Sequence, residues 1–188
     1  MRAGFVIESE SAAETEALGC CAGQEAPAGL IFCLRGELGA GKTVFVRGLA
    51  AGCLGPGQAA VTSPTYVLEH VYRSGQAAVH HLDLYRLTGG AADFEGAGLT
   101  ECLREPQGVV CIEWAERIEE ILPADRLEIE FEHLGPERRR VHLLATGPRS
   151  AKLADILVAR VGTRERLLSF LNRQRGGVPA AWEPSMRH

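Results

Sequence analysis

The chain has 188 residues, of which 46% are hydrophobic, so it can build one domain with a substantial core, with or without an appendage. It has no apolar run near the ~20 residues that cross a membrane, and its N-terminus lacks the apolar h-region of a signal peptide. These features exclude a membrane-spanning protein and predict a cytoplasmic one without a membrane partner.

The net charge of −4 is unevenly distributed along the chain. Residues 1–136 hold 9 Lys+Arg against 20 Asp+Glu, whereas residues 137–175 hold 10 against 3. Such asymmetry is typical of proteins that contact nucleic acid or an acidic partner. The six cysteines form no Cys-x-x-Cys pair, so we expect free thiols rather than a zinc site or a disulfide framework.

The first predicted elements are short. Residues 5–7 predict a strand, and Ser11-Ala12-Ala13-Glu14 matches a capping box that opens a helix through about Cys21. An apolar run at residues 30–34, bounded by glycine, predicts a buried strand. After the next loop, residues 44–51 predict a second helix.

Between that strand and that helix, residues 36–43 match the phosphate-binding loop G-x-x-x-x-G-K-[ST]. Its glycines let backbone N–H groups point inward and form an anion nest. Lys42 can reach the β- and γ-phosphates as a point charge, and the Thr43 hydroxyl can ligate Mg²⁺. The predicted nucleotide-binding residues are Glu37, Leu38, Gly39, Ala40, Gly41, Lys42, Thr43 and Val44.

A hydroxyl-rich stretch follows a glycine–proline breaker at residues 55–58, and it leads into an extended run that ends near Tyr72. Its position after the P-loop helix suits a nucleotide switch that approaches the γ-phosphate and Mg²⁺. An ordinary surface turn that feeds a strand fits the same sequence. The switch-like residues are Ser63, Pro64, Thr65 and Tyr66.

Two further apolar runs end in carboxylates. The run at residues 77–86 places His81 and Asp83 on one strand face, with Asp83 near the strand's end, where it can hold Mg²⁺ directly or through water. The second run ends at Glu113 and has the form of a Walker B strand. We expect His81 to be structural, because two ligands are too few for a transition metal. Trp114 can either shield the site or simply pack.

The remaining elements complete the sheet. Residues 88–103 predict a loop and one short helix, and residues 115–122 predict another short helix. Residues 127–132 alternate strictly between apolar and acidic side chains, which indicates a strand with a solvated acidic face. Residues 138–145 return as its partner, so the two strands form an antiparallel hairpin.

From residue 150 onward the apolar spacing is helical, with a break at Gly162-Thr163 and a loose end. We therefore divide the chain into a P-loop domain, residues 1–146, and a basic helical extension, residues 147–188. The basic segment 137–175 either contacts tRNA or an acidic partner surface, or turns its arginines to water from a helix that covers one edge of the sheet.

Four motifs in this order resemble the TsaE (formerly YjeE) family, the ATPase of bacterial tRNA threonylcarbamoyladenosine biosynthesis. The resemblance covers residues 5–146 and implies a three-layer α/β P-loop NTPase fold. Its central sheet would be mostly parallel with an antiparallel C-terminal hairpin, and the helical C-terminal extension would be added to it. The motifs are residues 36–43, Ser63-Pro64-Thr65-Tyr66, His81-Leu82-Asp83-Leu84-Tyr85-Arg86-Leu87 and Ile112-Glu113-Trp114-Ala115-Glu116-Arg117-Ile118.

The resemblance also implies roles for single residues. Lys42 would bind the phosphates of ATP, and Thr43 would bind Mg²⁺. Asp83 would be the second group linked to Mg²⁺, and Glu113 would be the Walker-B-like acid with Trp114 beside it. Among the catalytic candidates Lys42, Asp83 and Glu113, we expect Asp83 to serve the metal. Glu113, itself a further metal candidate, is expected to position the attacking water.

The family works with two partners, TsaD and TsaB. TsaD transfers the threonylcarbamoyl group onto the adenosine next to the anticodon, in tRNAs that read codons starting with A. The resemblance implies that ATP hydrolysis resets the TsaD–TsaB complex, so activity should be weak alone and stimulated by the partners. Two other functions stay open: a small-molecule P-loop kinase with an acceptor pocket, and a non-catalytic module in which ATP is only a conformational ligand.

Overall fold

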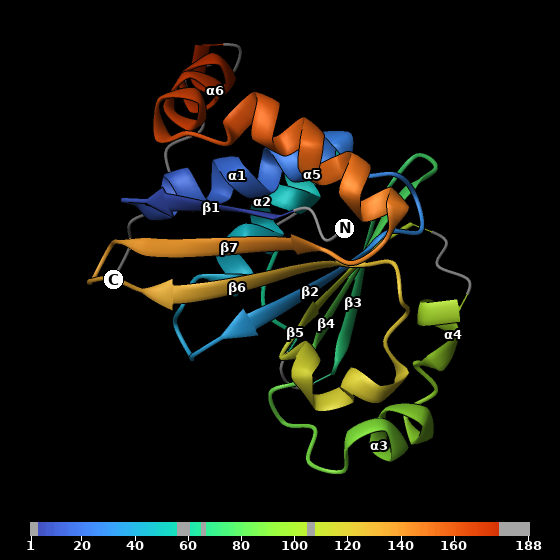
Figure 1. Cartoon of the computed structure of the whole chain (residues 1–188). Helices are drawn as coiled ribbons and strands as arrows, with labels where there is room; N and C mark the ends of the chain where they lie inside the picture. Colours follow the sequence, from blue (N-terminus) through green and yellow to red (C-terminus); the bar gives the residue numbers. More distant parts are fainter. Residues whose placement is uncertain (1–3, 56–60, 65–66, 105–107, 177–188) are drawn as a thin grey trace.

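The computed structural model describes residues 4–55, 61–64, 67–104 and 108–176. They form one seven-stranded sheet in the order β1-β7-β6-β2-β5-β4-β3, with helices on both faces (Figure 1). The elements are β1 (Gly4–Ser9), α1 (Ala12–Glu25), β2 (Ile31–Gly36), α2 (Lys42–Leu54), β3 (Glu69–Ser74), β4 (Ala77–Asp83), α3 (Gly90–Gly96), α4 (Thr100–Arg104), β5 (Val109–Glu113), the 3₁₀ helix η1 (Ala115–Ile121), β6 (Leu127–His133), β7 (Arg139–Ala145), α5 (Pro148–Val161) and α6 (Arg164–Gly176).

The predicted fold class is confirmed. The four central strands β6, β2, β5 and β4 run parallel, and β6 pairs with β7 as the predicted antiparallel hairpin. The two edge strands, β1 and β3, are antiparallel to their neighbours. Parallel strands end at the same edge of the sheet, so the carboxyl ends of β2, β4 and β5 come together.

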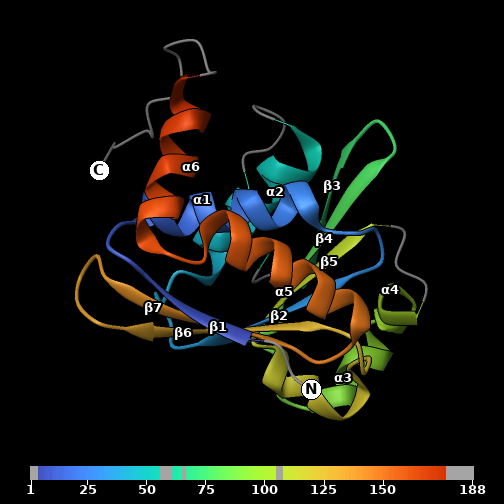
Figure 2. The same cartoon turned by 45° about the horizontal axis from the view of Figure 1, so that its top comes forward.

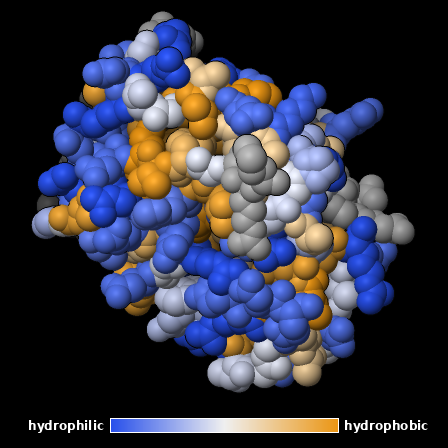
Figure 3. All heavy atoms as spheres, viewed as in Figure 1, coloured by the Kyte–Doolittle hydropathy of each residue, from blue (hydrophilic) through white to orange (hydrophobic). Residues whose placement is uncertain are grey.

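Strands β2 and β5 are buried on both faces along most of their length, as their continuous apolar runs predict. In β2, Phe32 and Leu34 belong to the larger core, beneath α1, α2, α5 and α6, whereas Ile31 and Cys33 belong to the smaller core, beside α3, α4 and η1. The result is the expected three layers. Hydrophilic side chains cover most of the face seen in Figure 3.

Helices α1 and α2 touch through their backbones. The contact uses Gly19 and Gly23 on α1 and Gly48 and Gly52 on α2, where an added Cβ would lie 1.9–2.2 Å from a backbone oxygen of the facing helix. The prediction that the first helix ends near Cys21 is wrong, because it continues to Glu25. Its glycines lower helix propensity, but the close contact with α2 requires them.

Two other predicted boundaries are also wrong. Strand β3 begins at Glu69, directly after Leu68 with its left-handed backbone (φ 64°), but it continues to Ser74 instead of ending near Tyr72. The region 88–103 contains two short helices, α3 and the start of α4, rather than one, since Gly98 has φ 75° and separates them. The predicted breaker at residues 56–58 and the tail at 177–188 lie outside the described residues.

The C-terminal helices pack onto the core. Leu153 and Leu157 of α5 and Leu167 and Phe170 of α6 are at most 1% exposed and belong to the same apolar cluster as the sheet. Figure 2 shows α5 crossing the sheet beside α1, with α6 standing next to α1. No helix of the described ranges is long and apolar enough to span a bilayer.

Arginines of the basic segment largely contact the rest of the protein. Arg160 pairs with Glu25, and Arg164 pairs with Glu10 and Glu14 of the N-terminal region. These ion pairs join the basic segment to the acidic body, so part of the charge asymmetry in the sequence is neutralised within the fold.

Candidate nucleotide-binding site

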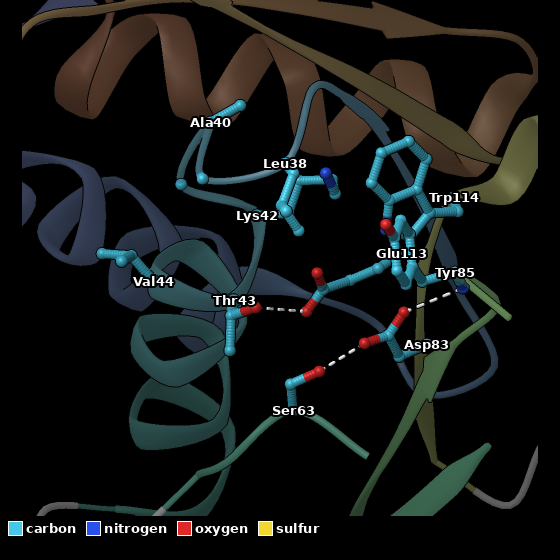
Figure 4. Close-up of a pocket in the computed structure, with 12 residues that line it drawn as sticks. Leu38, Ala40, Lys42, Thr43, Val44, Ser63, Asp83, Tyr85, Glu113 and Trp114 are labelled. Carbon is cyan, nitrogen blue, oxygen red and sulfur yellow. Dashed lines mark hydrogen bonds between the residues drawn. The ribbon is translucent and has the colours of Figure 1, made fainter. Parts of the chain in front are cut away.

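A pocket of about 360 Å³ opens at the carboxyl ends of β2, β4 and β5 (Figure 4). The loop between β2 and α2 forms one wall, and the ends of β4 and β5 form the other. Crevices outside the carboxyl ends of parallel strands are the usual ligand sites of such sheets. The lining residues are Leu38, Gly39, Ala40, Gly41, Lys42, Thr43, Val44, Ser63, Asp83, Tyr85, Glu113 and Trp114.

The structure brings most of the predicted site residues to this pocket. Two predicted residues lie just behind it: Glu37 contacts Lys42 through its carbonyl, and His81 contacts Glu113. Pro64 is buried beside Ser63 but does not line the pocket. Thr65 and Tyr66, the second half of the switch-like segment, lie outside the described residues.

The loop has the backbone that its glycines allow. Gly36, Gly39 and Gly41 have φ values of 130°, 77° and 108°, which other residues rarely adopt. Gly41 is the N-cap of α2, so the helix begins at Lys42 with its N-terminus facing the pocket. Backbone N–H groups at a helix start favour an anion.

Lys42 is held against its own loop. Its Nζ donates to the carbonyls of Gly36 at 2.6 Å and Glu37 at 2.9 Å, and lies 3.9 Å from the ring centroid of Trp114. Burial lowers the pKa of Lys42, while the charges of Glu113, Glu116 and Asp83 oppose that shift. The ammonium is therefore placed inside the loop, where a phosphate chain would be bound.

Glu113 connects β5 to the phosphate-binding loop. Its Oε1 accepts hydrogen bonds from Thr43 Oγ1 and from His81 Nε2, both at 2.8 Å. His81 is fully buried and Glu113 is 3% exposed. His81 thus contacts the Glu113 carboxylate from behind the pocket.

Asp83 lies beside Glu113 in the parallel register of β4 and β5. Its Oδ1 accepts from the backbone N–H of Tyr85 at 3.0 Å, and its Oδ2 accepts from the Ser63 hydroxyl. Figure 4 shows both contacts, with Ser63 reaching Asp83 from the segment after α2. Ser63, the first residue of the predicted switch-like segment, therefore contacts the second carboxylate of the pocket.

The oxygen atoms of three side chains in the pocket are suitable ligands for Mg²⁺. Thr43, Asp83 and Glu113 supply one hydroxyl and two carboxylates, which are the hard oxygen ligands that Mg²⁺ prefers. Within the described ranges no group of three or more His, Cys, Asp or Glu side chains could hold a metal. An Mg²⁺ ion in a nucleotide site takes one or two carboxylates and completes its shell with phosphates and water.

Aromatic side chains close one side of the pocket. Trp114 follows Glu113 with a left-handed backbone at φ 61°, and its ring lies 5.2 Å from that of Tyr85. Trp114 therefore packs against Tyr85 and also lines the pocket. Tyr85 was missed as a site residue, although its place two residues after Asp83 could have indicated it.

Together these features define a protein of the P-loop fold: a buried parallel strand, a glycine-rich loop, a helix start, and two carboxylates at the ends of adjacent strands. Comparison with solved structures agrees. The crystal structure of Bacillus subtilis YdiB aligns with a TM-score of 0.66 and 31% sequence identity, over 85% of this chain and 97% of that chain.

Sequence comparison identifies the family. The family model for the threonylcarbamoyl adenosine biosynthesis protein TsaE matches residues 9–141. The Bacillus subtilis tRNA threonylcarbamoyladenosine biosynthesis protein TsaE is 38% identical over 77% of this chain and 87% of its own length. The TsaE proteins of Treponema pallidum and Streptomyces coelicolor are 40% and 41% identical, over 71% and 70% of this chain and 95% and 89% of their own lengths. The chain belongs to the TsaE family, whose place is in tRNA threonylcarbamoyladenosine biosynthesis.

Proposed function

We propose that this chain is an Mg²⁺-dependent ATPase that acts with the TsaD–TsaB complex in tRNA threonylcarbamoylation. The observation that carries the proposal is the arrangement of Lys42, Thr43 and Glu113 around one pocket, with Thr43 bonded to Glu113 at 2.8 Å. The modified nucleoside would be the adenosine next to the anticodon, in tRNAs that read codons starting with A.

Catalysis by this chain would be electrostatic. Loop amides and the Lys42 ammonium would bind the phosphates and stabilise the charge that develops on the transferring group. When bound, Mg²⁺ would neutralise phosphate charge, held by Thr43 with Asp83 and Glu113. Glu113 would also position the attacking water, since His81 fixes its orientation through a 2.8 Å hydrogen bond.

The partner requirement follows from the family rather than from the pocket. Activity would be weak alone and stimulated by TsaD–TsaB, in the cytoplasm. Residues 1–146 would form the ATPase domain. The extension 147–188, with the rest of the basic segment 137–175, would add a surface for tRNA or an acidic partner. Lys152, Arg166 and Arg173 are exposed in this segment, which supports that role.

Phosphate release from Mg·ATP tests the proposal, measured for the chain alone and with purified TsaD–TsaB. We expect slow release alone, faster release with the partners, and loss of both on Lys42→Ala. Transfer of phosphate to an added acceptor would instead indicate a kinase. ATP binding without phosphate release, with partners present, would indicate a non-catalytic module.

A further inference from the structure

An arginine from outside the pocket contacts the back of the phosphate-binding loop. Arg139, the first residue of β7, donates from Nε to the Ala40 carbonyl at 2.9 Å and from Nη2 to the Gly39 carbonyl at 3.2 Å. It is 99 and 100 residues away from them in sequence. In Figure 1 the β6–β7 hairpin ends beside the loop that leads from β2 to α2.

The same guanidinium holds the hairpin turn. Its Nη1 lies 2.9 Å from the Gly135 carbonyl, 3.1 Å from that of Pro136 and 2.9 Å from that of Arg138. One planar group thus joins the turn between β6 and β7 to two consecutive carbonyls of the phosphate-binding loop. A lysine, with a single point charge, could not span both sets of acceptors.

The arginines on either side of Arg139 behave differently. Arg138 pairs with Glu8, and Arg140 pairs with Glu8 and Glu132 on the adjacent strands. Among the described residues Arg139 makes no ion pair, and its contacts are to backbone carbonyls. Its role is therefore distinct from the surface charge pairing around it.

The chemistry of the loop explains why such a contact matters. When the N–H groups of a loop converge on an anion, its carbonyls point outward and need donors of their own. A hydrogen bond to the Ala40 carbonyl also polarises the peptide unit it shares with the Gly41 N–H, which strengthens that N–H as a donor. The Arg139 charge adds to the positive potential of the nest.

We propose that Arg139 is a positioning residue for the phosphate-binding loop, acting through the carbonyls of Gly39 and Ala40. An effect of Arg139 on ATP binding rests on the proposed function. An effect of Arg139 on the conformation of the loop does not depend on it. The two consequences are tested by separate measurements.

The first measurement is amide hydrogen exchange of residues 36–43 in the full chain without nucleotide. Arg139→Gln should accelerate exchange in this loop by about tenfold, as expected for the loss of two hydrogen bonds. Arg138→Gln, on the same hairpin, should leave it unchanged. Unchanged exchange in Arg139→Gln, or equal acceleration in both variants, would overturn the inference.

The second measurement is Mg·ATP affinity, with inorganic tripolyphosphate as a probe of the phosphate contribution. Arg139→Gln should weaken the binding of Mg·ATP and of tripolyphosphate by roughly tenfold each. The maximal rate of phosphate release should change less. Arg139→Lys should recover only part of the loss. Normal affinity in Arg139→Gln would also overturn the inference. Failure of the wild-type chain to bind Mg·ATP, with faster loop exchange in Arg139→Gln, would overturn the proposed function and leave the positioning role intact.

Discussion

Thr43 and Glu113 share a 2.8 Å hydrogen bond although they lie 70 residues apart in sequence. The bond joins the first turn of α2 to the end of β5, and His81 supports it from behind through the other contact of the same carboxylate oxygen. A hydroxyl and a carboxylate that meet beside a phosphate-binding loop can serve one metal ion. Under the proposed function, the pair would mark the end of the pocket where the γ-phosphate reacts.

The two carboxylates should differ in effect when each is made neutral. Glu113→Gln should retain ATP binding and lose at least about 99% of phosphate release, because the water-positioning group is gone. Asp83→Asn should chiefly raise the Mg²⁺ concentration needed for half-maximal rate. The measurement is phosphate release across an Mg²⁺ titration, with nucleotide binding followed separately.

The control for this pair is Glu116→Gln. Glu116 is exposed and does not line the pocket, although its charge acts on Lys42. It should leave the rate and the Mg²⁺ requirement close to wild type. A Glu113→Gln variant that hydrolyses ATP normally would show that the water is positioned by another group.

Lys42→Ala should abolish turnover. Loss of one preorganised charge at a phosphoryl-transfer site costs about a hundredfold or more in rate, and here the variant also empties the centre of the loop. Lys152→Ala is a matched control, since Lys152 is the chain's other lysine and is exposed on α5. The measurement is phosphate release by both variants, with circular dichroism to check that each is folded. Equal rates in the two variants would show that Lys42 does not take part in hydrolysis.

Much of this site could be predicted from the sequence, because its key residues are set by local spacing. The glycine pattern before Lys42 and the carboxylates that end two apolar runs are readable without coordinates. The contact of Arg139 with the loop was not predictable, since it depends on how the β6–β7 turn meets the loop. Nor could the sequence show that residue 48 must lack a side chain, because that requirement comes only from the facing helix α1.

Gly48→Ala should destabilise the fold strongly. The added Cβ would lie 1.9 Å from the Glu16 carbonyl oxygen, so the two helices must separate. The cost of such overpacking, about 3 kcal/mol, exceeds the gain of ~1 kcal/mol in helix propensity. The net loss of about 2 kcal/mol should lower the melting temperature by roughly 4–8 °C.

Gly96→Ala is the control for that change. Gly96 ends α3, has no atom within 4 Å of an added Cβ, and has an ordinary negative φ. Its melting temperature should stay the same or rise slightly. If Gly48→Ala and Gly96→Ala have the same melting temperature, the close backbone contact between α1 and α2 is not needed for stability.

Asp125 should stabilise the start of α5 in a pH-dependent way. Its carboxylate accepts from the N–H groups of Arg149 and Ser150 at 2.8 and 3.0 Å, and from the Ser150 hydroxyl at 2.7 Å. Partial burial pulls the pKa of Asp125 upward, but these hydrogen bonds outweigh it and the pKa is lowered. A lowered folded-state pKa means that the stabilisation is complete above the unfolded value near 4 and is lost as the pH falls.

Asp125→Ala should therefore lower stability by about 1–2 kcal/mol at pH 7. The difference from wild type should shrink as the pH falls below about 4. Asp155→Ala, on the exposed side of α5, should show little difference at either pH. Urea unfolding at pH 7 and pH 3 measures both variants, and a difference that stays constant with pH would contradict a role for the charged carboxylate.

The basic segment can be tested for tRNA contact through its exposed arginines rather than by deletion. Removing residues 147–188 would expose the core positions that Leu153 and Phe170 fill, so a loss of binding could not be assigned to charge. Arg166 and Arg173 of α6 are exposed; Arg166 donates to the Val158 carbonyl of α5, and Arg173 donates to the Ser169 hydroxyl of its own helix. Replacing both with Gln should weaken tRNA binding severalfold at low salt.

The same double variant should reduce the slope of log affinity against log salt by about one to two, since each phosphate contact releases counterions. The matched control replaces Arg160 and Arg164, which are ion-paired with Glu25 and with Glu10 and Glu14. It should change tRNA binding less and thermal stability more. If removing the charges of Arg166 and Arg173 leaves affinity and slope unchanged, the two residues do not contact tRNA and their charge serves only the protein's surface.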